Sequence, residues 1–132
     1  MMATLNRLAP HILSLLRVAS ALLLMQHGTT KILGLPATQM TGVSLVSLPG
    51  IAGLFELIGG VLLLIGLFTR PVAFLLSGMT AVAYFMVHAG RDFYPINNGG
   101  ELAALYCFVF FYFVFSGPGP WSVDAVRNRW MA

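Results

Sequence analysis

Two acidic side chains interrupt the apolar part of this sequence and have the chemistry to exchange protons. Glu56 lies inside GLFELIGG, and Glu101 follows the two glycines of NNGGELAAL. A charged group within a membrane-spanning helix is costly, and by default it marks a site of proton transfer or ligand binding. We therefore interpret both glutamates as candidate catalytic residues for proton exchange. The structural alternative is that Glu56 pairs with Lys31 or with a histidine and holds two helices together.

Six further polar residues form a candidate cofactor-binding set: His27, Lys31, Tyr84, His88, Arg91 and Asn98. Their side chains donate or accept hydrogen bonds. Packing with a hydrogen bond is the simpler role for the tyrosine, whereas contact between helices and ligand binding are equally supported for the two histidines. Histidine and glutamate are also ligand types for zinc, iron or copper. No H-x-x-x-H, C-x-x-C or Glu-x-x-His pattern occurs on one segment, so the sequence predicts no metal site.

The composition places these residues in a membrane protein. The 132 residues are 58% hydrophobic and 8% charged, whereas about 25% of the residues in a soluble domain are charged. A helix needs about 20 mostly apolar residues to cross the hydrocarbon layer. Four runs approach this length: 12–32, 50–68, 71–89 and 100–116. We predict an all-α membrane protein with four transmembrane helices, formed by a single domain over residues 1–132.

Polar residues on these runs recur three and four positions apart, which is the spacing of a packing face in a left-handed bundle. On the fourth run that face would consist of Glu101, Leu105, Phe108, Tyr112 and Phe115. We predict that the ionisable residues meet in one outer vestibule and that lipid contacts the other faces. Arg17 lies about 15 Å along the first helix from His27, so we do not expect it to pair with Glu56.

The basic residues predict the orientation in the membrane. Most of them lie in flanks that the four helices place on one side: Arg7, Arg70, Arg127 and Arg129. Because short cytoplasmic segments are enriched in arginine and lysine, both termini should face the cytoplasm. The net charge of +3 then reflects topology, and no concentrated basic patch indicates nucleic-acid binding.

The order of the polar motifs along the chain resembles that of a known family. The motifs are MQHGTTKILG, LFELIGGVLLLIGLFTRPVA, FMVHAGRDFYP, NNGGELAALY and SGPGPWSVD. In this order they resemble the DoxX family of small, multi-pass proteins of the bacterial inner membrane, and the resemblance covers nearly the whole chain. The family takes its name from a subunit of a thiosulfate:quinone oxidoreductase, so the resemblance implies a quinone cofactor and an oxidoreductase partner subunit.

Two functions follow from these observations. In the first, the protein is a quinone-linked subunit of an oxidoreductase or oxidative-stress complex. The quinone is bound by His27 or His88 together with Tyr84, and a glutamate exchanges protons. In the second, the protein is a non-catalytic scaffold or assembly factor. Its buried charges fix the register between helices, and its loops contact a partner protein. A scaffold predicts paired charges and a filled interior, whereas a ligand site predicts a cavity lined by the histidines and glutamates. Both functions are compatible with a chain that acts alone or with a partner, and with a monomer or a homo-oligomer.

Overall fold

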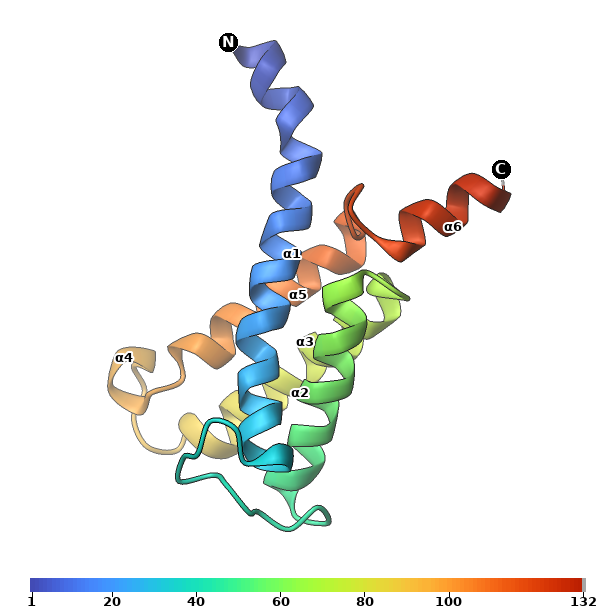
Figure 1. The fold of residues 1–132 in the computed structure, drawn as a ribbon. Helices are drawn as coiled ribbons and strands as arrows, with labels where there is room; N and C mark the ends of the chain where they lie inside the picture. The colour runs from blue at the N-terminus through green and yellow to red at the C-terminus, as the bar shows by residue number, and fades with distance from the viewer. Residues whose placement is uncertain (132) are drawn as a thin grey trace.

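The computed structural model describes residues 1–131, and every regular element in them is helical (Figure 1). The elements are α1 (Met2–Leu33), α2 (Leu48–Ile65), α3 (Thr69–Ala83), η1 (Tyr84–His88), α4 (Pro95–Asn98), α5 (Glu101–Ser116) and α6 (Val123–Met131). The π-helical segment η1 continues α3 without a break. The predicted all-α fold class is confirmed.

Three of these helices are long and apolar enough to cross a membrane. They are α1 with 32 residues, α2 with 18, and the continuous helix Thr69–His88 with 20. The apolar helix α5 has 16 residues, which corresponds to about 24 Å, less than the hydrocarbon thickness of about 30 Å. The chain is therefore a membrane protein with three candidate spans, and its fourth span stays a prediction.

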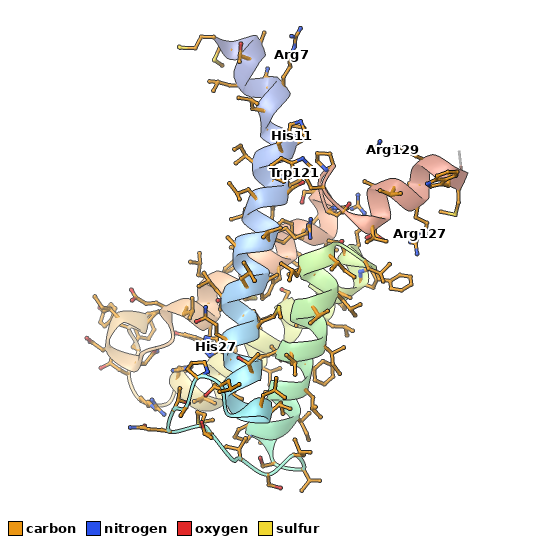
Figure 2. The ribbon with its side chains drawn as sticks, viewed as in Figure 1. Arg7, His11, His27, Trp121, Arg127 and Arg129 are labelled. Carbon is orange, nitrogen blue, oxygen red and sulfur yellow. The ribbon has the colours of Figure 1, made fainter. Side chains whose placement is uncertain are left out.

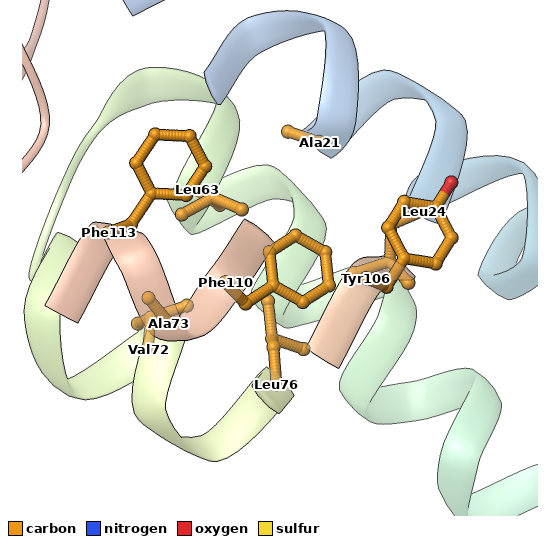
Figure 3. Packing of buried hydrophobic residues seen from close by; sticks show 9 residues of the cluster. All are labelled: Ala21, Leu24, Leu63, Val72, Ala73, Leu76, Tyr106, Phe110 and Phe113. Atoms are coloured by element: carbon orange, nitrogen blue, oxygen red, sulfur yellow. The ribbon is translucent and has the colours of Figure 1, made fainter. Parts of the chain in front are cut away.

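The helices pack as two pairs. Helix α1 lies along α2 and α3 lies along α5, while α2 and α3 join the pairs and α1 contacts α5 less extensively. His27 lies toward one end of this arrangement, and Arg7, Arg127 and Arg129 lie toward the other (Figure 2). The shared core, drawn in Figure 3, consists of Ala21, Leu24, Leu63, Val72, Ala73, Leu76, Tyr106, Phe110 and Phe113.

The prediction of which face of the fourth helix packs against the other helices is wrong. Leu105, Phe108, Tyr112 and Phe115 are all exposed, whereas α5 buries Tyr106, Phe110 and Phe113 against the other helices. The two faces have the same three-and-four spacing, and nearly every residue of α5 is apolar. Spacing alone could not select between them, and packing against α3 did.

Glycines bring α1 and α2 unusually close together. A Cβ atom added at Gly28 would lie 2.6 Å from the backbone nitrogen of Leu57 and 2.9 Å from the carbonyl oxygen of Gly53. Real Cβ atoms do not approach backbone atoms so closely, and these backbone atoms cannot move aside without displacing α2. The α1–α2 contact therefore requires the absence of a side chain at Gly28.

We expect Gly28→Ala to destabilise the protein by about 1–3 kcal/mol, the range for overpacking a well-packed contact. Thermal unfolding of the detergent-solubilised protein, followed by circular dichroism, measures the effect. The matched control is Gly78→Ala, because a Cβ atom there would meet nothing within 4 Å, and alanine favours the helix over glycine. Equal midpoints for the two variants would contradict the close contact between α1 and α2.

Candidate functional site

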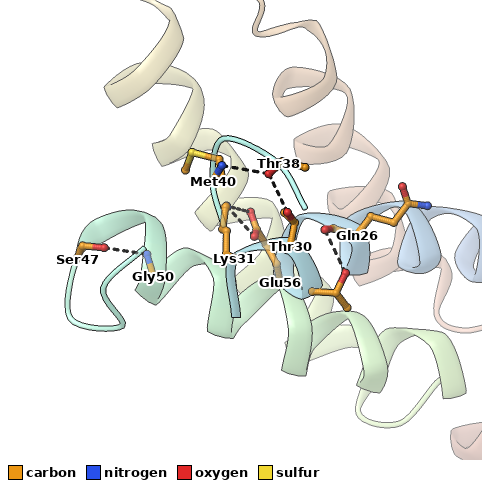
Figure 4. Close-up of polar contacts among 9 residues, drawn as sticks. Gln26, Thr30, Lys31, Thr38, Met40, Ser47, Gly50 and Glu56 are labelled. Atoms are coloured by element: carbon orange, nitrogen blue, oxygen red, sulfur yellow. Dashed lines mark hydrogen bonds and ion pairs between the residues drawn. The ribbon is translucent and has the colours of Figure 1, made fainter. Parts of the chain in front are cut away.

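Lys31 and Glu56 form a closed ion pair between α1 and α2. The Lys31 Nζ atom lies 2.8 Å from each carboxylate oxygen of Glu56, and only 11% of each side chain is exposed. Figure 4 shows the two side chains meeting between the helices. The paired arrangement that the sequence offered as the alternative for Glu56 is the one present in the structure.

The close approach of α1 and α2 positions this pair. Lys31 lies in the last turn of α1, and Glu56 lies in the middle of α2, one turn after Gly53. A Cβ atom at Gly53 would be 3.0 Å from the Lys31 Cβ atom. The lysine stem therefore runs over the bare backbone of Gly53 and brings the ammonium group to the carboxylate. The same small residues that pack the helices also direct the ion pair.

A second polar cluster is organised by Asn98, which is 2% exposed. Its Nδ2 atom donates to the Tyr84 hydroxyl at 3.2 Å and to the Asp92 carbonyl oxygen at 3.0 Å. Its Oδ1 atom accepts from the Gly100 backbone N–H at 2.7 Å. Both donors of the amide group are thus used within the protein. Asn98 therefore holds the loop between η1 and α5 in place.

His88 joins the Asn98 cluster through one ring nitrogen. Its Nδ1 atom lies 3.1 Å from the backbone carbonyl oxygen of Asn98. A carbonyl oxygen only accepts, so Nδ1 carries the proton. In the neutral ring this leaves Nε2 as a hydrogen-bond acceptor. His88 is half-buried and retains this one polar atom for another group.

The other three predicted site residues are exposed and stand apart. His27 lies on the surface of α1, Arg91 lies in the loop after η1, and Glu101 is the first residue of α5. Across residues 1–131, their side chains form no hydrogen bond or ion pair with the rest of the chain. The predicted residues therefore divide into the Lys31–Glu56 pair, the Asn98 cluster and these single groups, instead of forming one hydrogen-bonded vestibule.

Two cavities open on the apolar faces of the helices. One, of about 320 Å³, lies between α3 and α5 and is lined by residues such as Phe74, Ser77 and Phe108. The other, of about 220 Å³, lies between α2 and α3. Neither is lined by a predicted site residue. Within residues 1–131, no group of three His, Cys, Asp or Glu side chains is placed to hold a metal ion.

Tyr106 is a polar core residue that the sequence analysis did not select. It is 6% exposed, and its hydroxyl group has no hydrogen-bond partner among the described residues. Its ring stacks on Phe110 at 5.2 Å between centroids and lies nearly perpendicular to the His27 ring at 6.5 Å between centroids. No sequence signal could have selected it, because its three-and-four spacing with Phe110 and Phe113 is matched by the exposed face of α5.

Arg17 is the second important residue that lay outside the predicted site. It is fully buried, and its guanidinium donates to four backbone carbonyl oxygens. These belong to Leu63, to Leu64 at 2.5 Å, to Pro118 at 2.9 Å and to Trp121. It therefore ties α1 to the end of α2 and to the segment between α5 and α6. The prediction that Arg17 does not pair with Glu56 is confirmed.

Asp124 joins α6 to the start of α3. Its carboxylate accepts hydrogen bonds from the backbone N–H groups of Thr69 at 2.8 Å and Phe68 at 3.0 Å. Burial raises the pKa of Asp124, but the two backbone N–H groups and the nearby Arg127 outweigh it, and the net pKa lies below its ordinary value. The carboxylate thus satisfies donors at a helix N-terminus that have no partner within the helix.

This lowered pKa predicts an acid-dependent loss of stability. Because Asp124 binds a proton more weakly in the folded protein, its contribution is complete above the ordinary value of 3.8 and decreases as pH falls through the lower folded value. We expect Asp124→Asn to lower the thermal midpoint at pH 7 and to converge with the wild type as the pH falls below the lowered pKa of the folded protein. Asp92→Asn, at an exposed carboxylate, is the control. A difference that is constant with pH would contradict this account.

Comparisons with known proteins give two matches. The DoxX family model matches residues 12–89. A Haemophilus influenzae protein described as an uncharacterized protein is 44% identical over 128 residues, which are 93% of this chain and 96% of that protein. No solved structure gives a significant match.

Proposed function

Because the chain belongs to the DoxX family of small bacterial membrane proteins, we propose that it is a non-catalytic scaffold or assembly subunit of a membrane complex. The observation that carries the proposal is the closed pair of Lys31 and Glu56, in which each charge is neutralised within the protein. A buried ion pair of this kind serves register between helices better than it serves chemistry with a ligand. Arg17 is likewise satisfied by backbone carbonyl groups alone.

The proposal includes a topology and a location. The protein would lie in the bacterial inner membrane, cross it four times and keep both termini in the cytoplasm. The apolar character of α5 and its packing along α3 support the fourth span, which would need a locally thinner bilayer because α5 is short. The exposed arginines near the two termini support the orientation.

The segment between η1 and α5 is the proposed contact with a partner protein. Phe93 is 86% exposed and Ile96 is 75% exposed, although the backbone that carries them is held by Asn98. Large apolar side chains on a fixed segment outside the membrane-spanning helices are typical of an interaction surface. A scaffold would use such a loop to hold another subunit.

Site-specific photo-crosslinking in cells tests the scaffold. A photoreactive residue replaces Phe93 or Ile96, and we expect adducts of one defined mass that contain the same partner protein. Leu23, which is 52% exposed in the middle of α1, is the control position and should react with lipid alone. Lipid adducts at all three positions would remove the support for a partner at this loop.

Tyr106 supports a second candidate function, a quinone-linked subunit of an oxidoreductase. Its buried hydroxyl group has no partner and can donate to a quinone carbonyl oxygen, and its ring centroid lies 6.5 Å from that of His27. In this function Tyr106 and His27 would hold the headgroup, and the exposed Glu101 would exchange protons. The quinone itself, when bound, would supply the oxidation and reduction. Asn98 would act only by holding the loop, because its amide donors are already used.

Quinone binding to the detergent-purified protein distinguishes the two functions. The scaffold predicts no saturable binding of a short-chain quinone to folded wild-type protein. Saturable binding that is lost in Tyr106→Phe and kept in Tyr112→Phe would put the quinone-linked function first. Tyr112 is the matched control because its hydroxyl group lies on the exposed side of α5.

A further inference from the structure

Helix α6 presents an apolar stripe that no other part of the described chain covers. The stripe consists of Val123, Val126 and Trp130, which are 42%, 50% and 85% exposed. Their spacing of three and four residues places them along one side of a helix that turns about 100° per residue. The exposed side chains of Arg127 and Arg129 fall on opposite flanks of this stripe. This combination is typical of a helix that lies in the interface of a bilayer.

Contacts with the bundle fix the direction in which this stripe points. Asp124 is buried and caps the start of α3. The Arg127 guanidinium lies 5.0 Å from the centre of the Phe68 ring and 3.5 Å from the Asp124 carboxylate. These contacts hold α6 by its polar side against the turn between α2 and α3. The apolar stripe is therefore left on a part of the helix that faces away from the protein.

The end of the molecule that carries α6 is strongly basic. Four exposed arginines lie there: Arg7, Arg70, Arg127 and Arg129. Asp124 is the one acidic side chain at this end in residues 1–131, and its charge is engaged by backbone N–H groups. Figure 2 shows Arg127 and Arg129 on α6 and Arg7 on the projecting part of α1. At the opposite end, Asp92 and Glu101 are exposed, and so is Arg91. The charge distribution thus favours an anionic surface at the α6 end only.

We propose that α6 is an interfacial helix that binds the headgroups of anionic phospholipids. The apolar stripe enters the boundary between headgroups and acyl chains, and Trp130 lies at the depth that tryptophan prefers. Arg129 on one flank and Arg127 on the other contact lipid phosphates. Charge complementarity selects anionic lipid over zwitterionic lipid as the occupant. This binding is independent of whether the protein is a scaffold or a quinone-linked subunit.

Quenching of Trp130 fluorescence by brominated lipids tests the proposal. The full chain has two tryptophans, so Trp121→Phe leaves Trp130 as the reporter and keeps the backbone carbonyl that Arg17 uses. The protein is placed in nanodiscs of phosphatidylcholine with phosphatidylglycerol, and one of the two lipids is brominated. At equal lipid fractions, we expect brominated phosphatidylglycerol to quench Trp130 at least twofold more strongly, with a preference that weakens at high salt.

Arginine substitutions identify the residues that carry the preference. We expect Arg129→Gln to reduce the preference for phosphatidylglycerol by about fivefold in relative affinity, the effect of about one interfacial arginine. Arg91→Gln changes the charge equally at the other end of the molecule and should leave the preference intact. Circular dichroism confirms that each variant is folded.

Three results would overturn the proposal. Equal quenching by both brominated lipids would show that α6 does not select anionic headgroups. Emission typical of water without quenching would show that the stripe lies outside the interface. Shielding of Trp130 that occurs in nanodiscs with two copies of the chain, and disappears with one, would assign the stripe to a second protein molecule.

Discussion

Arg17→Met is expected to lower the free energy of unfolding by about 3–5 kcal/mol, the range for breaking a buried charged network. The guanidinium is fully buried and donates to four carbonyl oxygens from two distant segments. Methionine fills much of the same volume but donates no hydrogen bond. Carbonyl groups at the end of α2 and in the segment that precedes α6 would together lose the hydrogen bonds that the guanidinium donates.

Thermal unfolding in detergent and partial proteolysis measure this effect. Partial proteolysis also shows where the chain unfolds first. Loss of the Arg17 guanidinium should expose the segment around Pro118 and Trp121 to cleavage before the helices unfold. Arg17→Lys should be intermediate, since an ammonium group has three donors and lacks the planar fork of guanidinium. Arg91→Met is the control at an exposed arginine. If Arg17→Met and Arg91→Met were equally stable, the carbonyl contacts of Arg17 would not support the fold.

The ion pair of Lys31 and Glu56 gives the second large effect. Each single substitution, Lys31→Met or Glu56→Gln, leaves one charge without its partner in a nearly buried position. We expect each to destabilise the protein by about 3 kcal/mol, toward the lower end of the range for a broken buried pair because the pair retains slight exposure. The double variant removes both charges and should recover most of the lost stability.

The double-mutant cycle also separates a structural role of Glu56 from proton exchange by this residue. If the pair serves register, the double variant should keep the crosslinked partner at Phe93, although both single variants lose part of it. If Glu56 exchanges protons, the double variant should be folded and inactive in quinone chemistry. Additive losses of stability, with no recovery in the double variant, would contradict the ion pair itself.

Tertiary structure separated residues that the sequence grouped by depth. Counting residues along the helices placed His27, Glu56, His88 and Glu101 in the outer half of the bundle, and the sequence analysis put them in one vestibule. Depth along a helix follows from counting residues, but the direction of a side chain depends on how the helix is rotated against its neighbours. The structure turns Glu56 toward Lys31 and leaves Glu101 exposed at the start of α5.

The sequence alone determined the class of the protein and the approximate positions of its apolar helices. Long apolar runs have one physical solution in a membrane, because each backbone group must be hydrogen-bonded within its own segment. The turn at residues 66–71 was also readable, since Gly66 ends α2 in the left-handed conformation and Pro71 lies in the first turn of α3. These features depend on local composition and local backbone conformation.

Only the tertiary structure decided which groups meet. The four carbonyl partners of Arg17 come from segments about 46 to 104 residues away in the chain, and backbone carbonyls carry no sequence signal. The inner face of α5 was equally hidden, because a helix that is apolar on all sides does not indicate which side packs. The position of Asp124 at the start of α3 likewise depends on where the chain returns after α5. Composition placed the helices in a membrane, and packing between distant segments assigned partners to their polar groups.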